Sequence, residues 1–162
     1  VHPLRYALRV PGGQGGEVPG GAAVKLSPHF TLAEVTATQH GENIPSEEDI
    51  ERLRIVVLHA EVIRAEFSPI HGLAVTSGFR SEEVNRKVGG APNSAHLYGC
   101  ALDLVPLNPA VTIEEIWRWL PTSGLLYDQA IWEIGKRSQW LHYGLPRPGT
   151  KARMMTFIER KK

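Results

Sequence analysis

The run from Ser94 to Asp103 places a histidine and an aspartate at a spacing that suits metal binding. It follows the pattern S-x-H-x-x-G-x-A-x-D, with His96 and Asp103 seven residues apart. A neutral imidazole nitrogen and a carboxylate oxygen are both good zinc ligands, and Gly99 between them lets the backbone turn tightly. Two ligands do not make a zinc site, so a third must come from elsewhere in the chain.

His142 is the candidate for that third ligand, because it ends a later apolar run that begins with Trp140 and Leu141. Three protein ligands, with a fourth position left to water, are typical of a catalytic zinc site rather than a structural one. We therefore expect one zinc ion held by His96, Asp103 and His142.

Cys100 is a rival ligand, because thiolate binds zinc strongly. If Asp103 points to the metal from a strand, alternation places Cys100 on the opposite face. The prediction is a small buried residue outside the metal site. It is the only cysteine in the sequence, so it forms no internal disulfide and does not identify a redox compartment.

Several helices are expected to position these residues. Capping boxes at 31–34 and 112–115 each predict a short helix, and Ser81 begins another. A longer helix after Ser46 carries an apolar face at helical spacing: Leu53, Val56, Val57, Ala60, Ile63 and Phe67. His59 on this helix has no second ligand at i+4, so we interpret it as a surface or hydrogen-bonded histidine.

Strands are predicted at 73–76, 101–105, 128–133 and 140–145, with one more over 152–158. A short polar loop containing Gly135 joins the third and fourth strands into a hairpin. Because helices come first and an antiparallel sheet is concentrated late, the pattern predicts an α+β fold with a small antiparallel sheet.

Length and composition fit one globular domain of 162 residues, 42% hydrophobic and 22% charged. Residues 11–21 hold six glycines and two prolines. We therefore expect an N-terminal arm and Gly-rich linker over 1–23 and one domain over 24–162.

Charge and hydropathy argue against some partners. The formal net charge is +1 and no dense Lys/Arg stripe occurs, so we expect no nucleic-acid partner. No run approaches the ~18 apolar residues of a membrane span. No signal peptide is recognised, and the missing initiator Met leaves processing or excision from a longer protein open.

Three separated blocks together resemble a known family. The run SGFRSEEVNRKVGGAPNSAHLYGCALDL, followed by DQAIWE and WLHYGL, is similar to the zinc D-alanyl-D-alanine carboxypeptidase and L-alanyl-D-glutamate endopeptidase family. The resemblance covers residues 30–157 and implies a hedgehog-like fold, with the zinc site on the sheet and peptidoglycan stem peptides as substrate. Phages often encode such enzymes as endolysins or tail-associated lysins. The resemblance also implies zinc ligands at His96, Asp103 and His142, and Arg80 in the substrate pocket.

The sequence indicates the general base less directly than it indicates the zinc ligands. Relatives commonly carry a carboxylate a few residues before the last zinc histidine, but here the position three before His142 is Gln139. Glu133 is the nearest upstream acid, and a hairpin would fold it back beside His142. We therefore predict Glu133 as the base, with Asp128 and Glu159 as fallbacks.

Each of these roles has a plainer alternative. Glu133 would be a surface residue if it paired with Lys136 or Arg137. Arg80 could offer a forked donor to a substrate carboxylate or oxyanion, or it could only tie down its own turn. Ser94 could bind the peptide or orient the neighbouring histidine, or it could make only a local turn bond.

These features predict a zinc metallopeptidase that cleaves peptidoglycan stem peptides at the bacterial cell wall. We expect a monomer, or a part of a larger phage protein. Two alternatives come from other classes: a non-catalytic zinc-containing binding module of the same fold, and a virion or cell-wall structural protein with a vestigial pocket. Both carboxypeptidase and endopeptidase activity are compatible with the sequence.

Overall fold

One five-stranded sheet organises residues 23–160, which are the residues that the computed structural model describes. The strands are β1 (Leu73–Ser77), β2 (Ala101–Pro106), β3 (Gln129–Ile134), β4 (Gln139–Gly144) and β5 (Met155–Arg160). The helices are α1 (Leu32–Thr36), α2 (Glu47–Phe67), α3 (Glu82–Lys87) and α4 (Ile113–Trp119), with 3-10 turns η1 (Ala95–Tyr98) and η2 (Leu120–Thr122). The predicted α+β class is confirmed. The N-terminal arm and nearly all of the glycine-rich linker lie outside the described residues.

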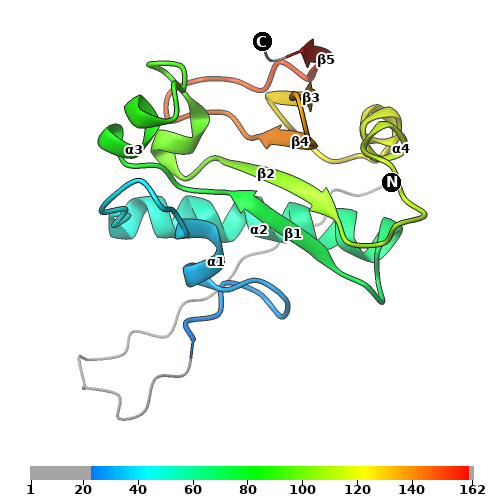
Figure 1. Ribbon diagram of the computed structural model, residues 1–162, viewed down its shortest axis with the longest axis horizontal. Helices are drawn as coiled ribbons and strands as arrows, with labels where there is room; N and C mark the ends of the chain where they lie inside the picture. Colours follow the sequence, from blue (N-terminus) through cyan, green and yellow to red (C-terminus); the bar gives the residue numbers. More distant parts are fainter. Residues whose placement is uncertain (1–22, 161–162) are drawn as a thin grey trace.

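The helices begin where the sequence predicts. The side-chain oxygens of Thr31, Ser46 and Thr112 each accept a hydrogen bond from the backbone N–H three residues later. Each of the three residues also donates its own backbone N–H to the carboxylate of that later residue, which completes a capping box. Helix α2 runs lengthwise beside β1 and β2, whereas α3 and α4 lie at opposite ends of the molecule (Figure 1). Within the described residues, no helix is both long and apolar enough to cross a bilayer.

The sheet has the strand order β1-β2-β4-β3-β5 and is antiparallel from β1 to β3. Strand β5 differs from the expected antiparallel arrangement because it pairs parallel to β3. The connection at 145–154 contains Pro146, Pro148 and Gly149, which do not continue a strand. Strand β4 ends at Gly144 opposite Gln129, so this connection only has to pass the start of β3, and β5 begins at the same end of the sheet as β3.

The two faces of the sheet have different roles. Leu102 and Leu104 of β2 and Leu141 and Tyr143 of β4 are fully buried in the core, together with the apolar face of α2. Because successive side chains of a strand point to opposite faces, Asp103 and His142 lie on the other face of the sheet. His59 of α2 lies on the core side, with its Nδ1 2.8 Å from the Tyr143 hydroxyl oxygen, so it is the hydrogen-bonded histidine that we expected.

Gly99 closes η1 in the left-handed conformation, at φ +64°. A Cβ atom there would lie 2.5 Å from the backbone oxygen of Asp49, so both the φ angle and the space require glycine. We expect Gly99→Ala to lower the free energy of unfolding in urea by more than ~2 kcal/mol.

Gly124→Ala is the matched control for this prediction. Gly124 has φ +79°, but no atom lies within 4 Å of the position that an alanine methyl group would take, so it carries only the conformational cost of about 1 kcal/mol. Equal losses in the two variants would show that the close approach to α2 does not matter.

Candidate functional site

Three potential ligand atoms converge on the face of the sheet opposite the core. His96 Nε2 lies 3.2 Å from Asp103 Oδ1 and 3.1 Å from His142 Nδ1, and the last two atoms lie 3.0 Å apart. Asp103 and His142 are direct cross-strand partners in β2 and β4, and His96 reaches them from η1. All three side chains are buried. The structure therefore brings together the three residues that the sequence nominates as metal ligands.

The spacing of these atoms fits a zinc ion. Ligand atoms placed tetrahedrally about 2 Å from zinc lie roughly 3.3 Å from one another. The observed separations of 3.0–3.2 Å are close to that value. Two imidazole nitrogens and one carboxylate oxygen form the mixed donor set of a catalytic zinc site. The group could hold a metal ion with little rearrangement of the side chains.

The second ring nitrogen of His96 determines which atom faces the site. His96 Nδ1 lies 2.6 Å from the carbonyl oxygen of Gly78, which can only accept, so Nδ1 carries the hydrogen and Nε2 keeps its lone pair. Burial lowers the pKa of His96 and outweighs the opposing effect of Asp103. The ring is therefore neutral at pH 7, which is the form that binds a metal.

Arg80 contacts the metal-site aspartate directly. Its Nη2 donates to Asp103 Oδ2 at 2.7 Å, and its Nε donates to Ser77 Oγ at 2.8 Å. Oδ1, the other oxygen of Asp103, is the one that faces the two histidines. Burial raises the pKa of Asp103, but its interactions with His96 and His142, including their hydrogen bonds, outweigh burial and hold the pKa far below its usual range. Arg80 thus fixes the orientation of a candidate ligand, a contact that sequence spacing did not reveal.

Glu133 shares one cleft with the three candidate ligands. The cleft has a volume of about 820 Å³. Glu133 and Ile131 lie on the same face of β3, and Ile131 is the cross-strand partner of His142. Glu133 is only 8% exposed, so it is not the surface glutamate of the plainer alternative. One same-face step along a strand is about 7 Å, which places Glu133 next to the metal group.

The other carboxylates have different surroundings. Glu159 lies beside Glu133 in the β3–β5 register and lines the same cleft. Asp128 precedes β3 and is held by Arg153, whose hydrogen bonds lower the pKa of its carboxyl group. Gln139 accepts a hydrogen bond at 2.8 Å from the indole of Trp132, on the face away from His142. The register of β4 is regular between Gln139 and His142, and residues three apart in a regular strand lie on opposite faces, so Gln139 does not face the site.

Ser94 and Cys100 lie close to the site without joining the ligand group. Ser94 Oγ accepts from the backbone N–H of His96 at 3.4 Å, which makes it the N-cap of η1 and favours the local role. Ser94 also lines the cleft. Cys100 is buried on the core side, where burial raises the pKa of its thiol, and it lies outside the group that could hold a metal.

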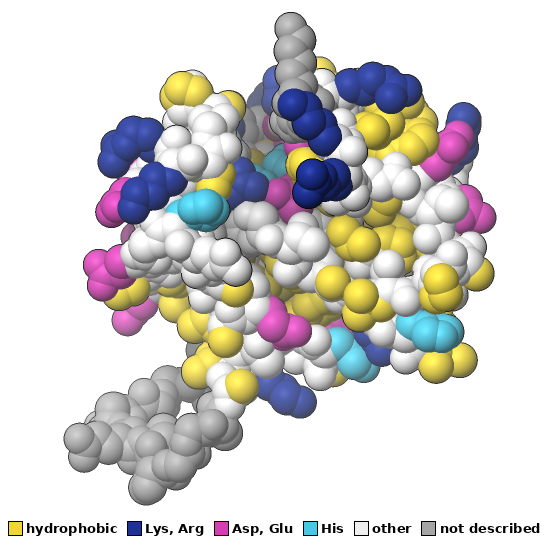
Figure 2. Space-filling view, viewed as in Figure 1, with side chains coloured by type: hydrophobic (Ala, Val, Ile, Leu, Met, Phe, Trp, Pro, Cys, Tyr) yellow, Lys and Arg dark blue, Asp and Glu magenta, His cyan; other side chains and the backbone are white. Residues whose placement is uncertain are grey.

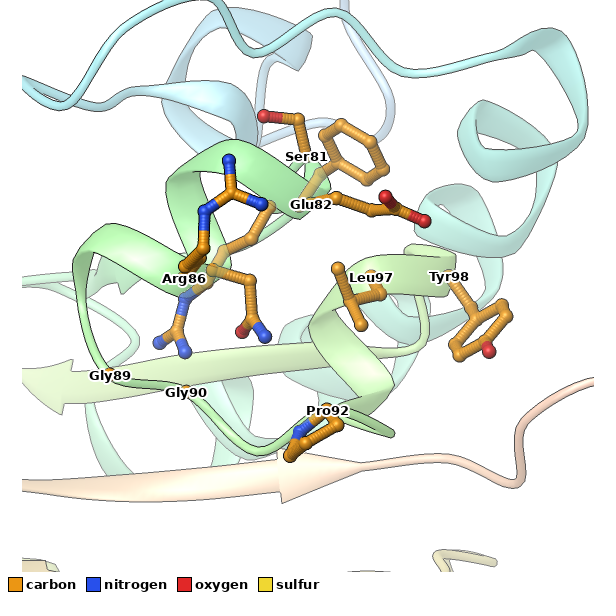
Figure 3. A pocket seen from close by; sticks show the side chains of 11 residues that line it. Ser81, Glu82, Arg86, Gly89, Gly90, Pro92, Leu97 and Tyr98 are labelled. Atoms are coloured by element: carbon orange, nitrogen blue, oxygen red, sulfur yellow. The ribbon is translucent and has the colours of Figure 1, made fainter.

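A second hollow of about 620 Å³ adjoins the cleft, and Arg80, Gly89 and Gly90 line both. Arg86 of α3 stands on one side of it and Tyr98 of η1 on the other (Figure 3). The loop at 88–93 therefore lies between the cleft and this second hollow, at the end of the molecule that holds α3.

Comparison with known proteins identifies a family that matches this chain. A family model described as Peptidase M15 matches residues 28–143, well over half of the chain. The matched span contains His96, Asp103, Glu133 and His142 and ends before β5. A comparison with curated protein sequences found no match.

Proposed function

Because the chain belongs to the peptidase M15 family, we propose that it is a zinc-dependent peptidase that cleaves peptide bonds in the stem peptides of peptidoglycan. The observation that carries this proposal is the convergence of three buried ligand atoms in a cleft that also holds a buried carboxylate. A metal site that served only to stabilise the fold would need neither an open cleft nor a neighbouring base.

His96 Nε2, Asp103 Oδ1 and His142 Nδ1 would hold the ion. A zinc ion at this position supplies Lewis-acid polarisation of the scissile carbonyl and lowers the pKa of water towards ~7. Glu133 accepts a proton from the attacking water and passes it to the leaving amine. Arg80, whose Nε and Nη2 are engaged, presents Nη1 to the carbonyl oxygen or a carboxylate of the substrate. Ser94 binds the peptide at the edge of the cleft.

The proposed place of action is the bacterial cell wall, where the protein would act as a monomeric endolysin, a virion-associated lysin or a host enzyme. The proposal covers both bonds cut by the family that the sequence resembles: the terminal D-alanyl-D-alanine bond and the bond between L-alanine and D-glutamate. The resemblance supports this substrate class.

Digestion of purified peptidoglycan tests the proposal. Zinc-loaded protein is expected to release fragments with one new amino terminus per stem peptide, identified by mass spectrometry. A chelator should abolish the release and added zinc should restore it. Stoichiometric zinc without any cleavage would instead support a non-catalytic binding module, and failure to bind zinc would support a structural protein with a vestigial pocket.

A further inference from the structure

The cleft carries opposite charges at its two ends. Glu133 and Glu159 are register partners near the ends of β3 and β5. Arg147 and Arg153 lie on the connection that passes the start of β3, and they line the same cleft. The metal group lies between these ends, at the level of Ile131. In the space-filling view, dark-blue basic side chains border the part of the surface where histidine and acidic side chains are visible (Figure 2).

Arg153 is anchored by one edge of its guanidinium. Its Nε donates to Asp128 Oδ1 at 2.8 Å and its Nη2 donates to Asp128 Oδ2 at 2.7 Å. The backbone N–H of Arg153 also donates to Asp128 Oδ1, at 3.2 Å. Asp128 is buried, whereas half of the Arg153 side chain is exposed. The guanidinium is therefore held in place while its Nη1 edge has donors left for a ligand.

Arg147 is anchored to the loop before η1. Its Nη1 donates to the carbonyl oxygen of Asn93 at 2.8 Å. Its own carbonyl oxygen accepts from both the backbone and the hydroxyl of Thr150, which fixes the turn that carries it. Nε and Nη2 of Arg147 have donors left for a ligand.

The charges at this end of the cleft do not balance. Two arginines face one aspartate, so Arg147, Arg153 and Asp128 together carry one net positive charge. Among the described residues, a third cationic residue that lines the cleft, Arg80, is paired with Asp103. A preorganised pair of guanidinium groups with unused donors is suited to bind a carboxylate, because Arg forms forked, charge-assisted hydrogen bonds.

We infer that Arg147 and Arg153 form an anion-binding wall that selects peptides with a free carboxylate close to the scissile bond. Gln129, at the start of β3, is one same-face step, about 7 Å, from Ile131 beside the metal group. An extended peptide advances about 3.3 Å per residue, so the carboxylate lies within one or two residues of the cleaved bond. Both arginines lie beyond residues 28–143, so the family match does not assign this role. The inference rests on the proposed peptidase function.

Paired synthetic stem peptides, one with the free carboxylate and one with the corresponding amide, test this inference. The parent protein is expected to cleave the acid with the lower KM. Arg147→Met and Arg153→Met should each raise KM for the acid on the order of 10-fold, with little change in kcat or in either constant for the amide. Zinc content should stay at the parent level. Lys151→Met, an exposed change in the same connection, should leave all of these values unchanged.

Two further measurements keep the test decisive. Within residues 23–160, the Arg147 side chain is anchored to a backbone carbonyl and not to a buried acid. Arg147→Met therefore decides the question if Arg153→Met fails to fold through loss of the Asp128 partner. If no peptide is cleaved, the peptidase proposal fails, and calorimetric binding of the acid and the amide to the zinc-loaded protein still tests the wall. Equal KM values, or equal affinities, of the acid and the amide for the parent protein would overturn the inference.

Discussion

A His96→Ala, His142→Ala double variant is expected to bind no stoichiometric zinc, whereas the parent is expected to bind one ion per chain. The two histidines supply two of the three converging ligand atoms, and Asp103 alone, already paired with Arg80, cannot hold the ion. Changes in residues that only orient ligands typically cost 10–100-fold in metal affinity, so each single ligand replacement should cost more than about 100-fold. Metal analysis after gel filtration and competition with a chromophoric chelator measure both values.

Cys100→Ala is the matched control for the ligand variants. It removes a strong potential zinc ligand only three residues from Asp103, but one that is buried on the core side. This variant should keep one zinc ion per chain. Loss of zinc in Cys100→Ala, or retention of stoichiometric zinc in the double histidine variant, would contradict the proposed ligand set.

Much of the scaffold could be predicted because its signals are local. A capping box is complete within four residues, as at Thr31 and Thr112, and strand alternation is read from the chain itself. Alternation also separates Asp103 from Cys100 without any tertiary information. The grouping of His96, Asp103 and His142 combined this local pattern with a family resemblance, since no local signal brings η1 and β4 together.

The parts that could not be predicted depend on how distant segments meet. Arg80 and Asp103 lie 23 residues apart, and their ion pair forms only because η1 and β2 fold back beside the end of β1. The connection at 145–154 contains two prolines and a glycine, and the sequence predicted a strand from residue 152 rather than from Met155. Nothing in its composition shows that it passes the start of β3, where Arg153 meets Asp128.

Glu133→Gln is expected to lower turnover of a stem peptide by ~10²-fold or more, with zinc content and thermal unfolding unchanged. The amide keeps the shape of the side chain but cannot take up a proton from the attacking water. Because the change leaves the three candidate ligands and the arginines in place, the loss should fall on kcat rather than on KM. Steady-state kinetics on zinc-loaded protein separate the two constants.

Glu159→Gln and Asp128→Asn show whether this effect is specific to one carboxylate. Glu159 lines the same cleft as the register partner of Glu133, so its replacement matches the change in charge and environment without removing the proposed base. Asp128 anchors Arg153 at the far end of the cleft, so Asp128→Asn should affect KM for a charged substrate more than kcat. An active Glu133→Gln variant together with an inactive Glu159→Gln variant would assign the base to β5 instead. Full activity in all three variants would exclude a carboxylate base in this cleft, because Glu133 and Glu159 are the acidic side chains, apart from Asp103, that line it among the described residues.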